Sequence, residues 1–175
     1  MKHNLYIICL LAICYSLISC DKSEIDHETE YNNSYSKWLA FRKSSQNSYS
    51  YRASDFSEIS VARTRINVTN GIVTRREFEC IRYYPSNDTV KWVEKNMDEI
   101  NTHNDREATK AITLDQIYHD AKTEWLVKRD GMNIIFTTDS QGIISTCGYQ
   151  EDNCPDCSFT GVHIDEVRTL YLMED

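Results

Sequence analysis

The residues whose side chains could most clearly carry chemistry are the cysteines, of which the chain has seven. Cys9 and Cys14 lie in an apolar N-terminal stretch, and Cys20 directly follows it. The rest of the chain holds Cys80, Cys147, Cys154 and Cys157. In an oxidising compartment this even number predicts disulfides, although four thiolates would also suit zinc or cuprous ion.

Four cysteines allow three pairings. We expect Cys80–Cys147 and Cys154–Cys157. The first bond would close a loop of about 67 residues, for which the chain-entropy model gives roughly 4 kcal/mol. In the alternatives, Cys147 pairs with Cys154 or Cys157, and Cys80 takes the remaining cysteine. A redox C-x-x-C opens a helix that lowers the pKa of its first thiol, whereas this one lies in a polar loop, so structural bonds are favoured over redox chemistry.

Carboxylates and imidazoles supply weaker candidate sites. One polar loop contains Asp98, Glu99, His103 and Asp105, a set that could hold a divalent cation but is also ordinary in an acidic protein. Asp115 and His119 lie four residues apart on a predicted helix, where a solvated helix face is preferred over a chelate. The chain contains no G-x-S-x-G motif, phosphate loop or dinucleotide fingerprint. We therefore expect no enzymatic activity and no cofactor, and a carboxylate-based hydrolase ranks third among the hypotheses.

The first twenty residues have the layout of a bacterial lipoprotein signal. Lys2 precedes an apolar run over residues 5–18, which is shorter than the roughly 20 residues that a membrane span requires. The run ends Leu-Ile-Ser-Cys at residues 17–20 and resembles a lipobox. The resemblance implies a chain cleaved before Cys20 and anchored there to a membrane of the cell envelope by acyl chains such as palmitate. It would face the periplasm or the cell surface.

Length and charge limit the remaining functions. The net charge of −8 becomes −9 once Lys2 leaves with the signal, which argues against nucleic acid and against attraction to anionic headgroups. The 156 residues left after removal of 19 from 175 suit one domain. We divide the chain into a signal peptide (1–19), the lipidated cysteine with a flexible linker (20–30) and a single domain (31–175).

Hydrophobic periodicity predicts two helices, each followed by strands. The first helix should cover residues 31–45, with a core-facing stripe of Tyr35, Trp38, Leu39 and Arg42. The second should begin at a capping box over residues 113–116 and end near 130–131. Strands are expected near residues 49–51, 59–61, 66–68, 72–84, 89–94, 133–138, 142–149 and 158–172.

A tight turn and a short internal sequence similarity indicate how these elements combine. Asn70-Gly71 lies between two strand-like runs, which is typical of a type I′ hairpin. Trp38-Leu39 and Trp125-Leu126 each precede strands in a similar context. The order predicts an α+β fold, an antiparallel β-sheet with two helices packed on one face. We hypothesise two αβββ-like halves.

Most of the domain resembles an uncharacterised family of bacterial envelope lipoproteins, the domain-of-unknown-function family 6174 or a close relative. The residues that carry the resemblance are Trp38, Tyr49, Tyr51, 68–73, 102–103, 113–118, 125–126, 135–139, 142–145, 148–149, 154–157 and 161–162. The family has no assigned activity. The resemblance therefore implies location and fold, and it leaves the function open.

The leading hypothesis is a lipid-anchored, non-catalytic module that binds another envelope protein. The chain has 11 tyrosines, a residue that favours both strands and binding surfaces. The candidate interaction surface consists of Tyr49, Tyr51, Tyr83, Tyr84 and Tyr149. The analogy with secreted inhibitor and assembly modules operates at the level of the fold. The alternative is a metal-binding or thiol-redox protein built on the four cysteines.

Overall fold

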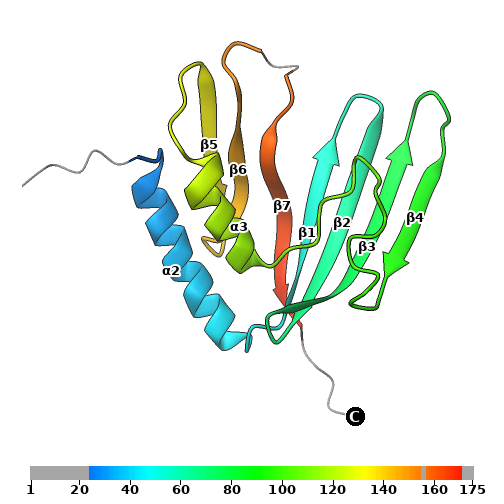
Figure 1. Cartoon of the computed structure of the whole chain (residues 1–175), viewed down its shortest axis with the longest axis horizontal. Coiled ribbons are helices and arrows are strands. Elements are labelled where there is room, and N and C mark those ends of the chain that lie inside the picture. The colour runs from blue at the N-terminus through cyan, green and yellow to red at the C-terminus, as the bar shows by residue number, and fades with distance from the viewer. Residues whose placement is uncertain (1–23, 155–156, 171–175) are drawn as a thin grey trace, which may run out of the picture.

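The computed structural model describes residues 24–154 and 157–170, which form one antiparallel sheet with helices on one face (Figure 1). The helices are α2 (Glu28–Ser44) and α3 (Leu114–Asp120), and α3 continues into a π-helical turn, η1 (Ala121–Trp125). The strands are β1 (Tyr49–Phe56), β2 (Ser60–Thr69), β3 (Ile72–Arg82), β4 (Thr89–Glu94), β5 (Met132–Thr138), β6 (Ile144–Glu151) and β7 (Thr160–Thr169). The predicted α+β class is confirmed.

The sheet consists of two meanders joined side by side. Its strand order is β4-β3-β2-β1-β7-β6-β5, so the first strand of one half pairs with the last strand of the other. The first half carries one strand more than an αβββ unit, and the second half fits that unit. The connection over residues 95–113 runs back from the β4 edge across the helix-covered face (Figure 1). This return brings α3 and η1 over the half of the sheet formed by β5, β6 and β7.

Local signals located several elements well. Asn70 and Gly71 have φ values of 51° and 81°, the positive angles that the predicted tight hairpin requires. Thr113 caps α3, because its side chain accepts a hydrogen bond from the Gln116 backbone N–H. β4 covers the predicted residues 89–94. The second helix is shorter than expected, since its last turn ends at Trp125.

The stripe that the first helix buries shares only Trp38 with the predicted one. Its buried residues are Tyr31, Ser34 and Trp38, while Tyr35 and Leu39 are more than one third exposed. Ser34 can be buried without loss because its hydroxyl has a hydrogen-bond partner, the Tyr118 hydroxyl at 2.7 Å. A polar side chain thus occupies a core position, and a hydrophobicity pattern cannot find it.

The ordered domain begins earlier than the predicted linker allows. α2 starts at Glu28, and Ile25 is buried and forms a β-bridge with Val127. The Asp26 N–H also donates to the Leu126 carbonyl at 2.8 Å. Residues 24–30 therefore belong to the domain, and the prediction of a flexible linker there was wrong. The rest of the predicted linker and Cys20 lie outside the described residues.

The Tyr118 side chain ties both helices to the sheet. Its hydroxyl donates to the Ser34 carbonyl at 3.3 Å and accepts from the Ile144 backbone N–H at 3.2 Å. Its ring also stacks against Trp38, with centroids 6.2 Å apart. Burial raises the pKa of Tyr118 to about 12, so the hydroxyl keeps its proton at neutral pH.

We expect Tyr118→Phe to lower the free energy of unfolding by about 1–3 kcal/mol, because the buried Ile144 N–H loses its acceptor. Urea denaturation at pH 7 measures this change. Tyr35→Phe is the matched control, because among the described residues the Tyr35 hydroxyl has no hydrogen-bond partner and the ring contacts survive the substitution. Equal stabilities for the two variants would contradict this role.

Candidate functional site

A β-bulge opens the sheet between its two halves. β1 and β7 pair from Tyr49↔Thr169 to Ala53↔Ile164, and Asp165 is the extra residue at the register shift. The Asp165 carboxylate accepts hydrogen bonds from Arg52 Nε at 3.1 Å and from the Ser54 hydroxyl. Beyond the Ala53↔Ile164 pair, which directly follows the bulge, the register pairs no further residues of the two strands, so the end of β1 and the start of β7 separate.

A cavity of about 1150 Å³ lies where the two strands separate. Its walls come from the β1–β2 hairpin, from the start of β7 and from the connection over residues 95–113, which we call the crossing loop. The side chains that set its chemistry are Asp55, Phe56, Glu58, Arg106, Glu107 and His163. Three carboxylates face one guanidinium, so the cavity favours a ligand that combines an apolar group with positive charge.

Four large hydrophobic side chains project beside this cavity, at the tips of two neighbouring hairpins. We call them the hairpin-tip patch: Phe56, Ile59, Tyr83 and Tyr84, which are 60%, 50%, 54% and 68% exposed. The Tyr83 N–H donates to the Ile59 carbonyl at 2.8 Å, which joins the β1–β2 and β3–β4 hairpins at this end of the sheet (Figure 1). Phe56 also lines the cavity, so the two features are continuous.

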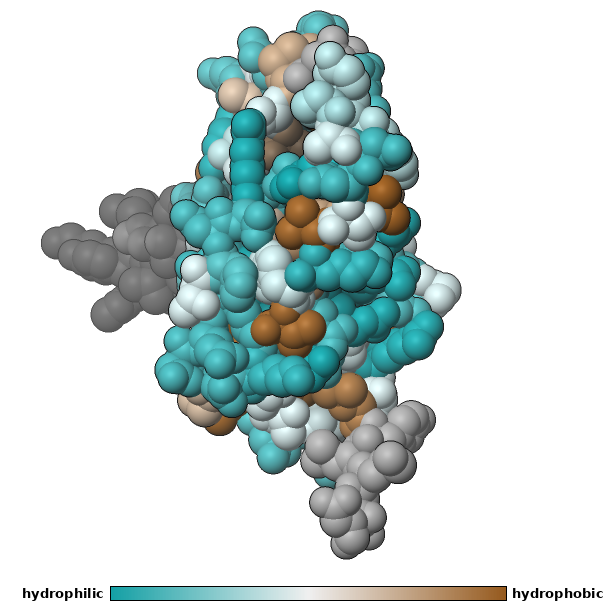
Figure 2. Space-filling view, turned by 90° about the vertical axis from the view of Figure 1, so that its right-hand side faces the viewer, coloured by the Kyte–Doolittle hydropathy of each residue, from teal (hydrophilic) through white to brown (hydrophobic). Residues whose placement is uncertain are grey.

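The side of the molecule toward β4 is otherwise mostly hydrophilic. Figure 2 shows this side as a largely teal surface with separate hydrophobic areas. Lys91 and Glu79 form an ion pair across β4 and β3 there, and charges at a sheet edge oppose unwanted strand pairing. The patch is therefore the more informative candidate for a contact surface.

The structure does not bring the five tyrosines of the predicted contact surface together on one exposed face. Tyr83 and Tyr84 are exposed, but Tyr49 and Tyr51 are fully buried beneath the helices. The Tyr49 hydroxyl accepts from the Leu114 N–H, and the Tyr51 hydroxyl donates to the Ile112 carbonyl. Burial raises the pKa of both. The sequence placed these two tyrosines on one face of a strand, and the tertiary structure covered that face.

Tyr149, the fifth predicted contact residue, is half-buried. The Arg129 guanidinium lies over its ring, 4.2 Å from the centroid. This cation–π contact occupies one face of the ring. Tyr149 therefore stabilises its own half of the domain and does not belong to the hairpin-tip patch.

The cysteines split into one bonded pair and two isolated thiols. Cys154 and Cys157 form a disulfide, as expected. The predicted Cys80–Cys147 bond was wrong, and so were the alternatives, because both thiols are free and buried. Three strands lie between β3 and β6, which corresponds to about 19 Å, whereas a disulfide requires Cα atoms within about 7 Å. A site built from all four cysteines is excluded for the same reason.

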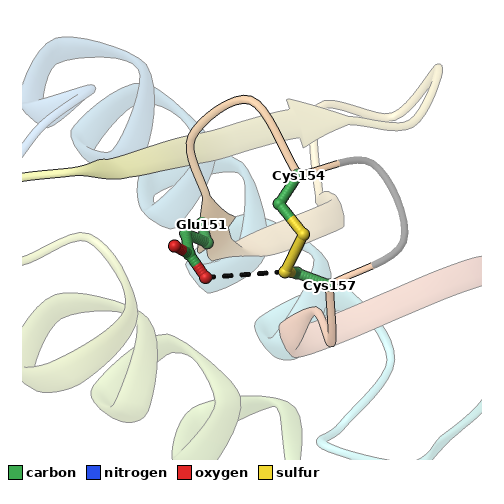
Figure 3. Close-up of a disulfide and its surroundings, with 3 residues drawn as sticks. All are labelled: Glu151, Cys154 and Cys157. Carbon is green, nitrogen blue, oxygen red and sulfur yellow. Dashed lines mark hydrogen bonds between the residues drawn. A yellow bond between two sulfur atoms is a disulfide. The ribbon is translucent and has the colours of Figure 1, made fainter.

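Glu151 lies beside the disulfide (Figure 3). Its Oε2 atom is 3.5 Å from the Cys157 sulfur. A disulfide sulfur carries no proton, so in the bonded state this is a close contact without hydrogen-bond character. Within the described residues, Glu151, Cys154 and Cys157 are the one group of three potential ligands that approach within 4.8 Å. While the bond is intact the two sulfurs are not thiolates, and the pair fastens the β6–β7 loop.

The two isolated thiols are unreactive by environment. Burial raises the pKa of Cys147 to about 12, and burial also raises the pKa of Cys80. Both are therefore protonated at neutral pH, and a protonated thiol is a poor nucleophile and a poor ligand. They act as small core residues of their strands.

In the loop with the candidate metal ligands, two of the carboxylates accept hydrogen bonds from protein groups. The Asp105 carboxylate accepts from Trp92 Nε1 at 2.6 Å, and the Glu99 carboxylate accepts from the Lys95 N–H at 3.0 Å. The His103 ring stacks on Trp92 with centroids 4.4 Å apart. Asp98 is exposed. Within the described residues, Asp98, Glu99, His103 and Asp105 do not come together as a ligand cluster, and three of them have other partners.

The loop is instead fastened by a buried carboxylate that sequence analysis missed. Glu94 is fully buried and lies 3.5 Å from the buried Arg76 guanidinium. It accepts from the backbone N–H groups of Asn101 and His103, both at 2.8 Å. Its position as the last residue of β4 gave no signal of burial. The loop closes over it through these contacts.

Asp115 has a similar structural role. Its Oδ1 atom accepts from Trp38 Nε1 at 2.9 Å and pairs with Arg42 at 2.8 Å. The expectation of a purely solvated helix face was therefore wrong for Asp115, although His119 is exposed. This carboxylate links α3 to α2.

Comparison with known proteins gives no assignment: no family model, curated protein or solved structure compared with the chain matches it. The resemblance to family 6174 remains a prediction. None of the helices in the described ranges has the length and apolar character of a membrane span.

Acid should weaken the domain through Glu94. Desolvation tends to raise the pKa of this carboxyl, but the His103 and Asn101 amides and the Arg76 guanidinium outweigh it and hold the pKa below 4.5. A carboxyl with a lowered native pKa stabilises the fold above its unfolded pKa, and this contribution is lost as the pH falls through the native value.

We expect Glu94→Gln to lower the free energy of unfolding by about 3–5 kcal/mol at pH 7, since Arg76 stays buried without a counter-charge. The difference from wild type should shrink as the pH falls below about 4.5. Urea titrations from pH 7 to pH 3 measure both effects. Glu58→Gln, at an exposed position, is the control and should change stability by less than about 0.5 kcal/mol. A loss for Glu94→Gln that is independent of pH would contradict the explanation.

Proposed function

We propose that this protein is a lipid-anchored component of a bacterial cell envelope whose single domain binds a partner protein and has no catalysis of its own. The anchor is supported by the Leu-Ile-Ser-Cys sequence at residues 17–20. The binding role is supported by the hairpin-tip patch, the single observation that carries it. Large apolar side chains that are exposed together are typical of interaction surfaces, whereas single exposed apolar residues are ordinary.

The patch is well prepared for binding. Its residues sit at or next to the ends of paired strands, so their backbone is fixed before any partner arrives. Aromatic side chains on rigid supports lose little conformational entropy on binding. Tyrosine also combines a large apolar face with a hydrogen-bonding hydroxyl, which suits the edge between an interface and water.

Charge indicates the chemistry of the partner. Asp55 and Glu58 are exposed in the cavity wall, and neither has an ion-pair partner within 4 Å in the described part of the chain. Glu107 is 3.9 Å from Arg82, a weak pair. An acidic rim beside an apolar patch fits a protein segment that carries Lys or Arg next to an aromatic or aliphatic side chain.

Photo-crosslinking in the cell of origin tests the binding surface. With a photoreactive residue at Tyr84, we expect a discrete protein adduct, whereas the same residue at Tyr35, an exposed tyrosine on α2, should give none of that mass. Tyr83→Ser combined with Ile59→Ser should reduce crosslinking from position 84 at least tenfold, because the patch loses two central contacts. The urea midpoint of this double variant should stay close to that of wild type.

Two results would overturn the binding proposal. One is an identical adduct pattern from positions 84 and 35. The other is an adduct from position 84 whose yield the double substitution leaves unchanged although the variant is folded. The partner segment in a genuine adduct should contain basic and apolar residues, and a segment rich in Asp and Glu would contradict the charge argument.

The anchor has an independent test. Wild-type protein should sediment with membranes, resist salt extraction and yield a mature N-terminus at Cys20 that carries acyl chains by mass spectrometry. Cys20→Ser should remain unacylated and should not yield the mature N-terminus at position 20, because both steps depend on the cysteine of the lipobox. Cys9→Ser, within the predicted signal, is the control and should mature normally. An acyl-free wild-type protein would refute the anchor.

A further inference from the structure

We infer that the anchor holds the domain with one particular end against the bilayer, the end formed by the start of α2 and the β5 edge. The occupant of this surface is the lipid headgroup layer. The inference rests on the proposed acylation of Cys20. It follows from how much chain separates that residue from the first fixed residues of the domain.

The connecting chain is very short. Four residue steps lead from Cys20 to Glu24, the first described residue. A fully extended chain covers at most about 3.3–3.6 Å per residue, so these steps reach no more than roughly 14 Å. This is a covalent limit that holds for any conformation of the segment. Glu24 therefore stays within that distance of the acylated cysteine.

The domain side of the connection is fixed as well. Ile25 is only 9% exposed and bridges to Val127, and the Asp26 N–H donates to Leu126. His27 Nε2 lies 3.2 Å from the Ile134 carbonyl on β5. The chain therefore joins the body at the β5 end, and it cannot extend the tether without breaking these contacts and exposing Ile25.

The two ends of the sheet are far apart. Figure 1 shows the start of α2 near β5 at one end of the longest axis, with β4 at the other. Six strand spacings separate β5 from β4, which is about 29 Å at 4.8 Å per spacing. The tether therefore holds the β5 end near the headgroups, and β4 is the part of the sheet that can lie farthest from them.

Electrostatics does not supply this orientation. The start of the domain carries Glu24, Asp26, Glu28 and Glu30, which anionic headgroups repel. The orientation therefore comes from tether length and should be similar on neutral and anionic vesicles. A spacer long enough to relax the tether should abolish it.

The orientation also limits where the partner is found. The hairpin-tip patch lies on β1 to β3, three to five strand spacings from β5. That is about 14–24 Å along the sheet, to which the tether adds at most roughly 14 Å. The contact surface is then within about 40 Å of the headgroups. Its partner must itself be membrane-embedded, membrane-anchored or held close to the same bilayer.

Fluorescence quenching on vesicles tests the orientation. The acylated full-length chain is reconstituted into phosphatidylcholine vesicles that contain a nitroxide-headgroup lipid. A thiol-reactive fluorophore is attached to Glu30→Cys, beside the anchored end, or to Lys91→Cys, on the far edge. Both native positions are exposed, and the native free thiols are buried. We expect quenching at position 30 to exceed that at position 91 several-fold.

A spacer variant provides the matched control. Inserting about twelve Gly/Ser residues between Asp21 and Lys22 gives a flexible tether with a root-mean-square length near 22 Å. The quenching ratio should then fall toward one. Equal quenching at the two positions with the native spacing, in protein that remains bound to the vesicles, would overturn the orientation alone. Failure of acylated protein to stay bound, or a mature wild-type protein without acyl chains, would instead overturn the anchor.

Discussion

The pairing of β1 with β7 is the constraint on which the rest of the structure depends. It joins the first strand of one meander to the last strand of the other, and it is the single strand pair that unites the two halves of the described sheet. Ionic contacts reinforce it on the open face, where Glu166 lies between Arg52 and Arg65 at 3.8 and 3.6 Å. A bulge at Asp165 shifts the register, and the pairing ends one pair later at Ala53↔Ile164. The cavity exists because the two halves are joined along only part of their length.

The covered face is held by polar contacts within an apolar layer. Tyr118 and Asp115 fix the two helices against each other and against the sheet, and Glu94 with Arg76 fixes the long crossing loop. A buried ion pair adds little net stability because both charges lose hydration. Here the pair holds the crossing loop in place, since Glu94 accepts hydrogen bonds from backbone N–H groups of a loop that has no regular secondary structure. That loop forms one wall of the cavity.

The proposed anchor and the proposed binding surface occupy different parts of the same rigid sheet. The start of α2 docks on the β5 end, and the hairpin-tip patch belongs to the other half. A rigid sheet keeps a nearly constant separation between the two regions. This arrangement suits a protein that presents a contact surface at a set distance from a membrane, with no requirement for conformational change.

Local chemistry in the sequence determined a large part of this protein. Asn70-Gly71 accepts positive φ at both positions, Thr113 caps its helix, and Cys154 lies three residues from Cys157. Each feature depends on a few neighbouring residues, so a pattern can reveal it. The α+β class followed from adding such local preferences along the chain.

Only the tertiary structure decided which of these residues meet. The strand order placed Cys80 and Cys147 on well-separated strands, and the helices covered the face that holds Tyr49 and Tyr51. The burial of Glu94 likewise depends on partners distant in sequence. Such pairings are set by the summed burial of the whole sheet, and no window of neighbouring residues contains that sum. The cavity has the same origin, because it lies where β1 and β7, which are distant in sequence, stop pairing.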